Sequence, residues 1–265
     1  MKNITNIAKE AYSMFYKRVD HRTDGWILMG SPWASIAIIA LYFYMTKSAG
    51  PRFMRKRDAF SLDYVLKAYY ILQILACAYL ANSLLSAGWG WHYKIFCEPV
   101  DYSMKPMALK HARAVYFYYI LKIVDLLDTM FLILRKKYRK VTWLHLYQHA
   151  GMVMIGWIWA RYFAGGHGTL TVLFNCLAQM CMYLHYLMTS LRPKLKENMW
   201  WKKYLQRLYV FQFVLLLLHG STVFLVRNCK YSRIATIILL FQNGILLLFF
   251  INYLWQDRIK KKKFY

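Results

Sequence analysis

Residues 234–255 read IATIILLFQNGILLLFFINYLW, a stretch of the chain that contains no charged side chain. A helix that crosses the hydrocarbon core of a membrane needs about 20 mostly apolar residues, and this stretch is long enough to do so. Lipid offers the backbone no hydrogen-bond partners, so only helices and closed barrels can span it. The stretch therefore predicts a transmembrane helix, and the remaining sequence repeats the same pattern.

The composition extends this prediction to the whole chain. It is 59% hydrophobic and 18% aromatic with a mean hydropathy of +0.26, yet its net charge is +25, so the basic residues must lie outside the apolar stretches. Apolar blocks separated by Lys/Arg clusters are typical of multi-pass membrane proteins. We predict an all-α fold with seven transmembrane helices near residues 26–46, 64–86, 112–134, 141–163, 169–190, 204–226 and 234–255. These form one membrane domain (26–255), preceded by an N-terminal segment (1–25) and followed by a basic tail (256–265).

The basic residues also predict an orientation. They cluster in the first, third and fifth connections and in the tail, at residues 47–57, 135–140, 192–203 and 258–263. Cytosolic loops carry the excess of Lys and Arg, so we expect these four regions in the cytosol, with a lumenal N-terminus and a cytosolic C-terminus. Lys262 and Lys263 stand before the last two residues, which fits a dilysine signal for retrieval to the endoplasmic reticulum. The expected surroundings are thus the lipid bilayer of that organelle, and no nucleic-acid partner is expected.

Cysteine placement agrees with this topology. Cys97 and Cys229 fall in two connections expected on the lumenal side, where an oxidising compartment permits a disulfide between them. Cys77, Cys176 and Cys181 lie within predicted spans, and we expect them to be reduced residues of the core.

Polar residues inside the spans are the candidates for function, because ionisable groups at membrane depth are costly and usually functional. Three consecutive spans carry such residues on one helical face each. The third holds Lys122, Asp125, Asp128 and Thr129, the fourth His145, Gln148 and His149, and the fifth Asn175, Gln179 and Tyr186, with His185 further round. Lys122 can pair with Asp125 at i+3. That pair either belongs to a shared functional interior or only holds two helices together.

These residues carry a resemblance to a known family. The segment Lys122-Ile-Val-Asp125-Leu-Leu-Asp128-Thr129 is similar to the Lys-x-x-Glu-x-x-Asp-Thr motif of the ELO family of very-long-chain fatty acid elongases. His145-Leu-Tyr-Gln148-His149 resembles its His-x-x-His-His box, and residues 175–186 resemble its Asn-x-x-x-His-x-x-Met-Tyr-x-Tyr-Tyr box. Further similarities lie at residues 50–54, 97–102, 200–204 and 229–231. The resemblance implies seven helices, six of which form an inverted barrel around an acyl tunnel.

The resemblance also implies an activity, the condensation of a long-chain acyl-CoA with malonyl-CoA to give a 3-oxoacyl-CoA, CO2 and CoA. These two thioesters are substrates, and no further cofactor or metal is expected. The catalytic positions that it implies here are Lys122, Asp125, Asp128, His145, Gln148, His149, Asn175, Gln179 and His185. The substrate-binding positions are Thr129, Tyr183, Tyr186 and Gln212. Other enzymes of the elongation cycle, or a second copy of the chain, are the expected protein partners.

Two glutamines depart from the family pattern. Gln148 and Gln179 stand where the family has histidines, and an amide nitrogen can neither carry an acyl group as imidazole does nor act as a base near neutral pH. Two classes of function therefore stay open. The chain is either a condensing enzyme that uses His145, His149 or His185 instead, or a non-catalytic relative that binds acyl-CoA or active elongases. A di-iron oxygenase is disfavoured, because the other histidines lack box spacing.

Overall fold

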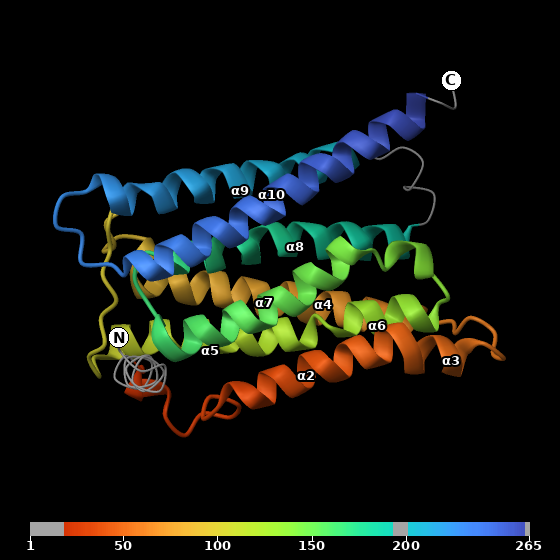
Figure 1. Cartoon of the computed structure of the whole chain (residues 1–265), viewed down its shortest axis with the longest axis horizontal. Coiled ribbons are helices and arrows are strands. Elements are labelled where there is room, and N and C mark those ends of the chain that lie inside the picture. Colours follow the sequence, from red (N-terminus) through yellow and green to blue (C-terminus); the bar gives the residue numbers. More distant parts are fainter. Residues whose placement is uncertain (1–18, 193–200, 263–265) are drawn as a thin grey trace, which may run out of the picture.

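The computed structural model describes residues 19–192 and 201–262, and it folds them into helices joined by short connections (Figure 1). The long helices are α2 (Pro32–Tyr44), α4 (Asp63–Leu84), α5 (Pro106–Val124), α6 (Leu127–Leu134), α7 (Trp143–Tyr162), α8 (Thr169–Leu191), α9 (Lys202–Leu225) and α10 (Arg233–Lys262). The described residues contain no β-strand. The prediction of an all-α fold is thereby confirmed for this part of the chain.

Among the described residues, four stretches are long and apolar enough to cross a membrane: Asp63–Trp89, Thr169–Leu191, Arg207–Leu225 and Arg233–Gln256. They coincide with the second, fifth, sixth and seventh predicted spans. The first predicted span is built from shorter helical pieces, and the third and fourth contain the polar residues singled out above. The chain is thus a multi-pass membrane protein. Several of its helices are less apolar than the others because they carry a polar face toward the interior of the bundle.

The first predicted span has the wrong boundaries. Residues 26–30 form turns, and the helix begins at Pro32, after Ser31 accepts a hydrogen bond from the Trp33 amide at 3.3 Å. Proline suits the first helical position because its missing N–H has no partner there in any case. Beyond Tyr44 the rod continues through a π-helical segment, Met45–Ala49, into α3 (Gly50–Met54). The π segment ends beside Pro51, whose missing N–H removes one ordinary helical hydrogen bond.

Two other predicted boundaries are also corrected. The third span starts earlier, at Pro106, and is broken at Asp125 and Leu126 into α5 and α6. The last helix runs past the predicted end of the seventh span to Lys262, so residues 256–262 of the predicted tail continue α10. The retrieval motif itself, Lys262 with Lys263, lies outside the residues whose side chains are described.

Successive connections lie at opposite ends of the bundle (Figure 1). One end carries the turns after α3 and α6 and the end of α10, and the other carries the connections before α5, between α7 and α8, and between α9 and α10. This alternation is the one that the basic clusters predict. We refer to the first as the basic end and to the second as the disulfide end.

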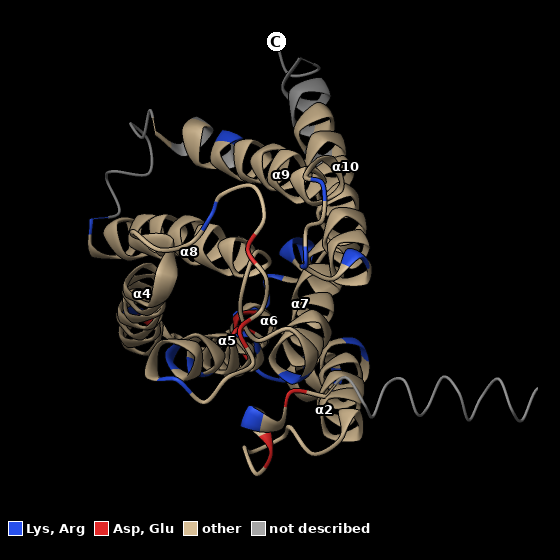
Figure 2. Cartoon of the chain, turned by 90° about the vertical axis from the view of Figure 1, so that its left-hand side faces the viewer, with Lys and Arg blue, Asp and Glu red and all other residues tan. Residues whose placement is uncertain are grey.

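Viewed along the bundle, the labelled helices α4, α5, α7, α8, α9 and α10 lie around a central region (Figure 2). Helix α4 packs against α5 and α8, α5 packs against α7, and α9 packs against α8 and α10. A hydrogen bond of 3.0 Å from the Tyr147 hydroxyl to the Gln242 Oε1 atom links α7 to α10. Helix α2 lies outside this ring, against α7.

The start of the described chain is fastened to the disulfide end. Arg22 is buried, and its guanidinium binds the Asp20 carboxylate and the carbonyl oxygens of Asp101, Ala108 and Ala164. Residues 19–25, the described part of the predicted N-terminal segment, therefore pack against the disulfide end. At the surface nearby, hydrogen bonds from His21 and Arg161 hold the pKa of the Asp24 carboxyl below its usual range.

Cys97 and Cys229 form a disulfide at this end, the pairing expected from the sequence. It ties the connection before α5 to the connection between α9 and α10, and its Cα atoms are 5.9 Å apart. Cys77 and Cys176 are buried free thiols, as expected. Cys181 is exposed, and its assignment to the core was wrong because it lies on the outward face of α8.

Candidate active site

A buried polar network lies where α4, α5 and α8 meet. The Lys122 Nζ atom is 3.0 Å from the Asp125 Oδ2 atom, and both side chains are almost fully buried. Gln179 of α8 joins them, since its amide nitrogen donates to both carboxylate oxygens at 3.0 Å and its carbonyl oxygen accepts from Lys122. The polar faces of the third and fifth predicted spans therefore meet in one cluster.

Gln73 of α4 belongs to this network and was missed in the sequence. It is fully buried, and its amide nitrogen donates to the Asp125 Oδ1 atom at 2.8 Å and to the Tyr69 hydroxyl at 2.9 Å. A signal was present, because Gln73 is a polar residue in the middle of a predicted apolar span. The Asp125 carboxylate thus accepts hydrogen bonds from three different side chains.

Asp128 begins the next part of the site, on α6. Its Oδ2 atom accepts a hydrogen bond of 2.7 Å from the Tyr183 hydroxyl, which is 3.4 Å from that of Tyr69. Tyr183 packs against Tyr186, whose ring also contacts Tyr70. A wall of tyrosines from α4 and α8 therefore lies beside the two carboxylates.

The histidines of α7 lie on the opposite side of α6. The His145 Nε2 atom is 2.8 Å from the Thr129 hydroxyl, which also bonds to the Tyr42 hydroxyl at 2.8 Å. The rings of His145 and His149 are 4.4 Å apart between centroids. His149 is half-buried and keeps some accessible surface. No described residue forms a hydrogen bond with its ring.

Asn175 is connected to the network through one intermediate residue. It accepts a hydrogen bond of 2.9 Å from the Tyr118 hydroxyl, and the Tyr118 ring lies 4.7 Å from the Lys122 Nζ atom. Gln148 is partly exposed beside the two histidines.

Other predicted site residues lie away from the network. The His185 Nδ1 atom accepts from the Trp201 indole at 3.3 Å, which directs this imidazole toward the start of α9. Gln212 is buried on α9, and its Oε1 atom has no partner among the described residues. Tyr209, also on α9, stacks on Phe250 of α10. The charges of Lys122 and Asp125 act on its hydroxyl.

A second histidine pair occurs at the disulfide end. The rings of His167 and His219 stack at 3.7 Å, and the His167 Nε2 atom donates to the His219 carbonyl oxygen at 3.0 Å. Sequence analysis missed this pair, because 52 residues separate its members and no spacing rule relates them. Within residues 19–192 and 201–262, no group of three or more His, Cys, Asp or Glu side chains is placed to hold a metal.

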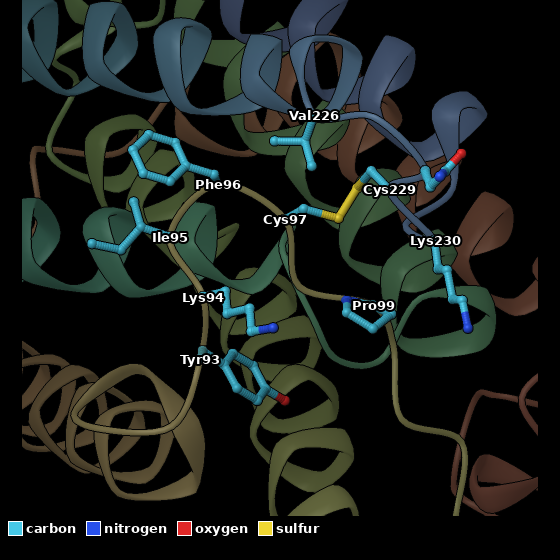
Figure 3. Close-up of a pocket in the computed structure, with 10 residues that line it drawn as sticks. Tyr93, Lys94, Ile95, Phe96, Cys97, Pro99, Val226, Cys229 and Lys230 are labelled. Atoms are coloured by element: carbon cyan, nitrogen blue, oxygen red, sulfur yellow. A yellow bond between two sulfur atoms is a disulfide. The ribbon is translucent and has the colours of Figure 1, made fainter.

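An open pocket of about 660 Å³ lies beside the disulfide (Figure 3). Apolar side chains such as Ile95 and Phe96 line it, together with Lys94, Lys230 and the Cys97–Cys229 bond. None of the residues of the polar network lines it, so this pocket is not the candidate active site.

Comparison with known proteins agrees with the motifs. The model of the family described as ELO, GNS1/SUR4 family, matches residues 27–264. The chain is 32% identical over 253 residues to a Rattus norvegicus protein named very long chain fatty acid elongase 7, covering 96% of this chain and 90% of that protein.

Two further relatives are also named very long chain fatty acid elongases. A Homo sapiens very long chain fatty acid elongase 1 is 31% identical over 263 residues, covering 99% of this chain and 93% of the relative. A Drosophila melanogaster elongase 7 is 36% identical over 212 residues, covering 80% of this chain and 64% of the relative. The helical architecture, the three motifs on adjoining helices and these matches together show that the chain belongs to the ELO family.

Proposed function

We propose that this protein elongates fatty acids by condensing a long-chain acyl-CoA with malonyl-CoA to a 3-oxoacyl-CoA. The observation that carries the proposal is the polar network of Lys122, Asp125, Gln73 and Gln179, with His145 and His149 beside it, inside a ring of helices of an ELO family member. In this proposal six helices form an inverted barrel around the acyl chain, and α2 packs outside it, as the order of helix contacts supports.

We assign the acyl carrier to His149. The lone pair of its imidazole attacks the thioester carbonyl, the C–S bond breaks, and CoA leaves as a thiol after taking a proton. Malonyl-CoA then loses CO2, and the resulting enolate attacks the acyl-imidazole and breaks the C–N bond. The released imidazolate takes one proton from solvent, which restores the neutral histidine. The accessible surface of His149 and the absence of a described partner for its ring support this assignment.

The surrounding residues take supporting roles in the proposal. His145, whose Nε2 atom bonds to the Thr129 hydroxyl, lies close enough to His149 to accept its proton. Gln148 offers an amide donor for the developing negative charge on a carbonyl oxygen. Arg135 and Lys140, at the basic end, face the phosphates of CoA.

We also propose the endoplasmic reticulum membrane as the location, with the disulfide end in the lumen. An oxidising lumen permits the Cys97–Cys229 bond, and the larger basic clusters at the other end follow the positive-inside rule.

A second candidate function is that of a non-catalytic relative that binds acyl-CoA or active elongases. The observation that favours it concerns the Gln179 amide. Both of its polar atoms already form hydrogen bonds within the protein, to Lys122, Asp125 and Gln73. A side chain held in this way by the fold offers little to a substrate.

One assay separates the two. Purified protein is incubated with labelled malonyl-CoA and a series of long-chain acyl-CoAs, alongside His149→Ala and the control His92→Ala, an exposed histidine at the disulfide end. Elongated product from wild type and from His92→Ala, with loss of about a hundredfold or more in His149→Ala, supports the assignment. If wild type gives no product but Gln148→His with Gln179→His does, the protein is a non-catalytic relative.

A further inference from the structure

A small pocket at the basic end is separate from the polar network. It has a volume of about 310 Å³ and is lined by Pro51, Met54, Arg55, Lys136 and Tyr138, and we call it the α3–α6 pocket. Helix α3 packs on the outside of α6, where Gly50 lies close to the Ile133 side chain. Asp128 and Thr129 of α6 instead contact Tyr183 and His145, so α6 stands between the pocket and the polar network.

The backbone of α6 places one of the two cations. The helix ends in a Schellman motif, in which the Lys136 amide donates to the Ile133 carbonyl at 2.9 Å and the Lys137 amide to the Leu132 carbonyl at 2.8 Å. This motif puts Lys136 in the left-handed region, with φ of 52°. Glycine is the usual residue there, and a side chain costs about 1–2 kcal/mol. A lysine kept at such a position suggests a use for its charge.

The charge of the pocket is not balanced by the residues around it. Within the described chain, no ion pair engages the side chain of Arg55 or Lys136. The nearby carboxylate of Asp63 lies 3.9 Å from Arg135, which does not line the pocket. The exposed residues next to the lining residues in the sequence are mostly basic, with Asp58 as the acid among them: Arg52, Lys56, Arg57, Arg139 and Lys140. An anion at this place would therefore gain from two direct cations and from the field of their neighbours.

The remaining lining suits an amphiphile. Pro51 and Met54 give an apolar floor, and Met54 is fully buried. Tyr138 at the rim is 40% exposed, and the neighbouring Phe53, with Arg57 stacked 4.1 Å over its ring, is 49% exposed. Aromatic rings with such exposure are enriched where a membrane protein meets the head groups of the lipid. The pocket thus combines two cations, a phenol and apolar surface at the level where a membrane helix ends.

We propose that the α3–α6 pocket binds the phosphate-bearing head group of an anionic glycerophospholipid from the leaflet at the basic end. The phosphodiester oxygens accept from Arg55, Lys136 and the Tyr138 hydroxyl, and the glycerol backbone rests on Pro51. Basic pockets beside transmembrane helices are known sites for such head groups. This site depends on the membrane embedding of the chain and not on the elongation reaction.

The test measures lipid binding by the full chain in nanodiscs of phosphatidylcholine with increasing phosphatidylinositol. The pocket variant is Arg55→Gln with Lys136→Asn, because asparagine tolerates the left-handed region. The matched control is Lys56→Gln with Arg139→Gln, which removes two charges from the same end but not from the pocket lining. We expect the apparent dissociation constant for phosphatidylinositol to rise about tenfold or more in the pocket variant and less than about threefold in the control. Equal weakening of both variants would reduce the effect to diffuse surface charge and overturn the proposal.

Two further arms identify the source of the phosphate. Inorganic phosphate and CoA are each added as competitors against phosphatidylinositol. Displacement by millimolar inorganic phosphate would show a site for soluble anions, and displacement by CoA that is lost in the pocket variant would assign the pocket to the substrate. Lys136→Gly serves as a second variant, because it removes the charge while relieving the backbone, and it must weaken binding without lowering the thermal midpoint. None of these measurements uses malonyl-CoA, so failure here is distinct from failure to elongate.

Discussion

Asp125 is the residue on which the polar network depends, because it is the only described acid that neutralises Lys122. Removing one partner of a buried ion pair leaves an uncompensated charge, which costs about 3–5 kcal/mol. We expect Asp125→Leu to lower the thermal midpoint of the detergent-solubilised protein sharply, as followed by fluorescence-detected size-exclusion chromatography.

The double variant Lys122→Met with Asp125→Leu is the control. It removes both charges, so it should recover a large part of the lost midpoint although Gln73 and Gln179 lose partners. A double variant as unstable as the single one would mean that the pair contributes through hydrogen bonds alone.

Many single residues of the polar network could be predicted from the sequence. Lys122 and Asp125 could be paired from their spacing, and Gln179 could be placed on an inward face. The contact of Gln73 with Asp125 could not be predicted, because it joins residues 52 apart through the docking of α4 on α5. His185 shares a motif with Gln179 but turns toward Trp201, since residues six apart on a helix point in different directions.

A substitution at Gly50 tests how closely α3 must approach α6. A Cβ atom there would lie 2.5 Å from the Met45 carbonyl oxygen and 3.0 Å from the Ile133 side chain. Gly50→Ala should therefore push α3 away from α6 and destabilise the protein by about 1–3 kcal/mol, seen as a lower thermal midpoint.

Gly244→Ala provides the comparison for this prediction. Nothing lies within 4 Å of a Cβ atom at Gly244, which is also inside a helix, and alanine is favoured over glycine there by about 1 kcal/mol. Its midpoint should stay level or rise. Equal losses in both variants would show that backbone flexibility, not the α3–α6 contact, is what matters.

At the scale of elements, apolar length located the helices but not their interruptions. The break at Asp125 and Leu126 and the π segment at Met45–Ala49 have no signature in a hydropathy pattern. The π segment lies beside Pro51, which removes a local helical hydrogen bond, and the break lies where the Asp125 carboxylate accepts side-chain hydrogen bonds from Gln73 and Gln179 of neighbouring helices. Both interruptions lie close to proposed sites, where regular helices would aim the side chains differently.

The disulfide acts on the molecule as a whole, since it joins cysteines 132 residues apart. Cys97→Ser with Cys229→Ser should lose about 2–5 kcal/mol, the range seen when a native disulfide that closes a long loop is removed. The thermal midpoint should fall, whereas Cys181→Ser, which alters an exposed free thiol, should leave it unchanged. Equal midpoints for all three proteins would show that the bond adds nothing to stability.

The proposed orientation is tested by introducing glycosylation sequons, which are modified only in the lumen. His92→Asn with Lys94→Thr places one at the disulfide end, and Asp58→Asn with Phe60→Thr places one at the basic end. Only the first should gain a glycan, seen as a gel shift removed by endoglycosidase. A shift in the second protein alone would invert the orientation.

The hydrogen bonds of the Arg22 guanidinium and the Cys97–Cys229 disulfide can form only late in synthesis of the chain. Arg22 is made early, but the Ala164 carbonyl that it binds leaves the ribosome 142 residues later, and Cys97 must wait for Cys229. At about 5–20 residues per second, Cys97 remains an unpaired thiol for roughly 7 to 26 seconds. During that interval the nascent chain is open to mispairing with oxidoreductases or other thiols, and only the arrival of the α9–α10 hairpin ends it. A truncated chain that stops before residue 229 would therefore leave the translocon with a reactive cysteine and no means of closing the bundle.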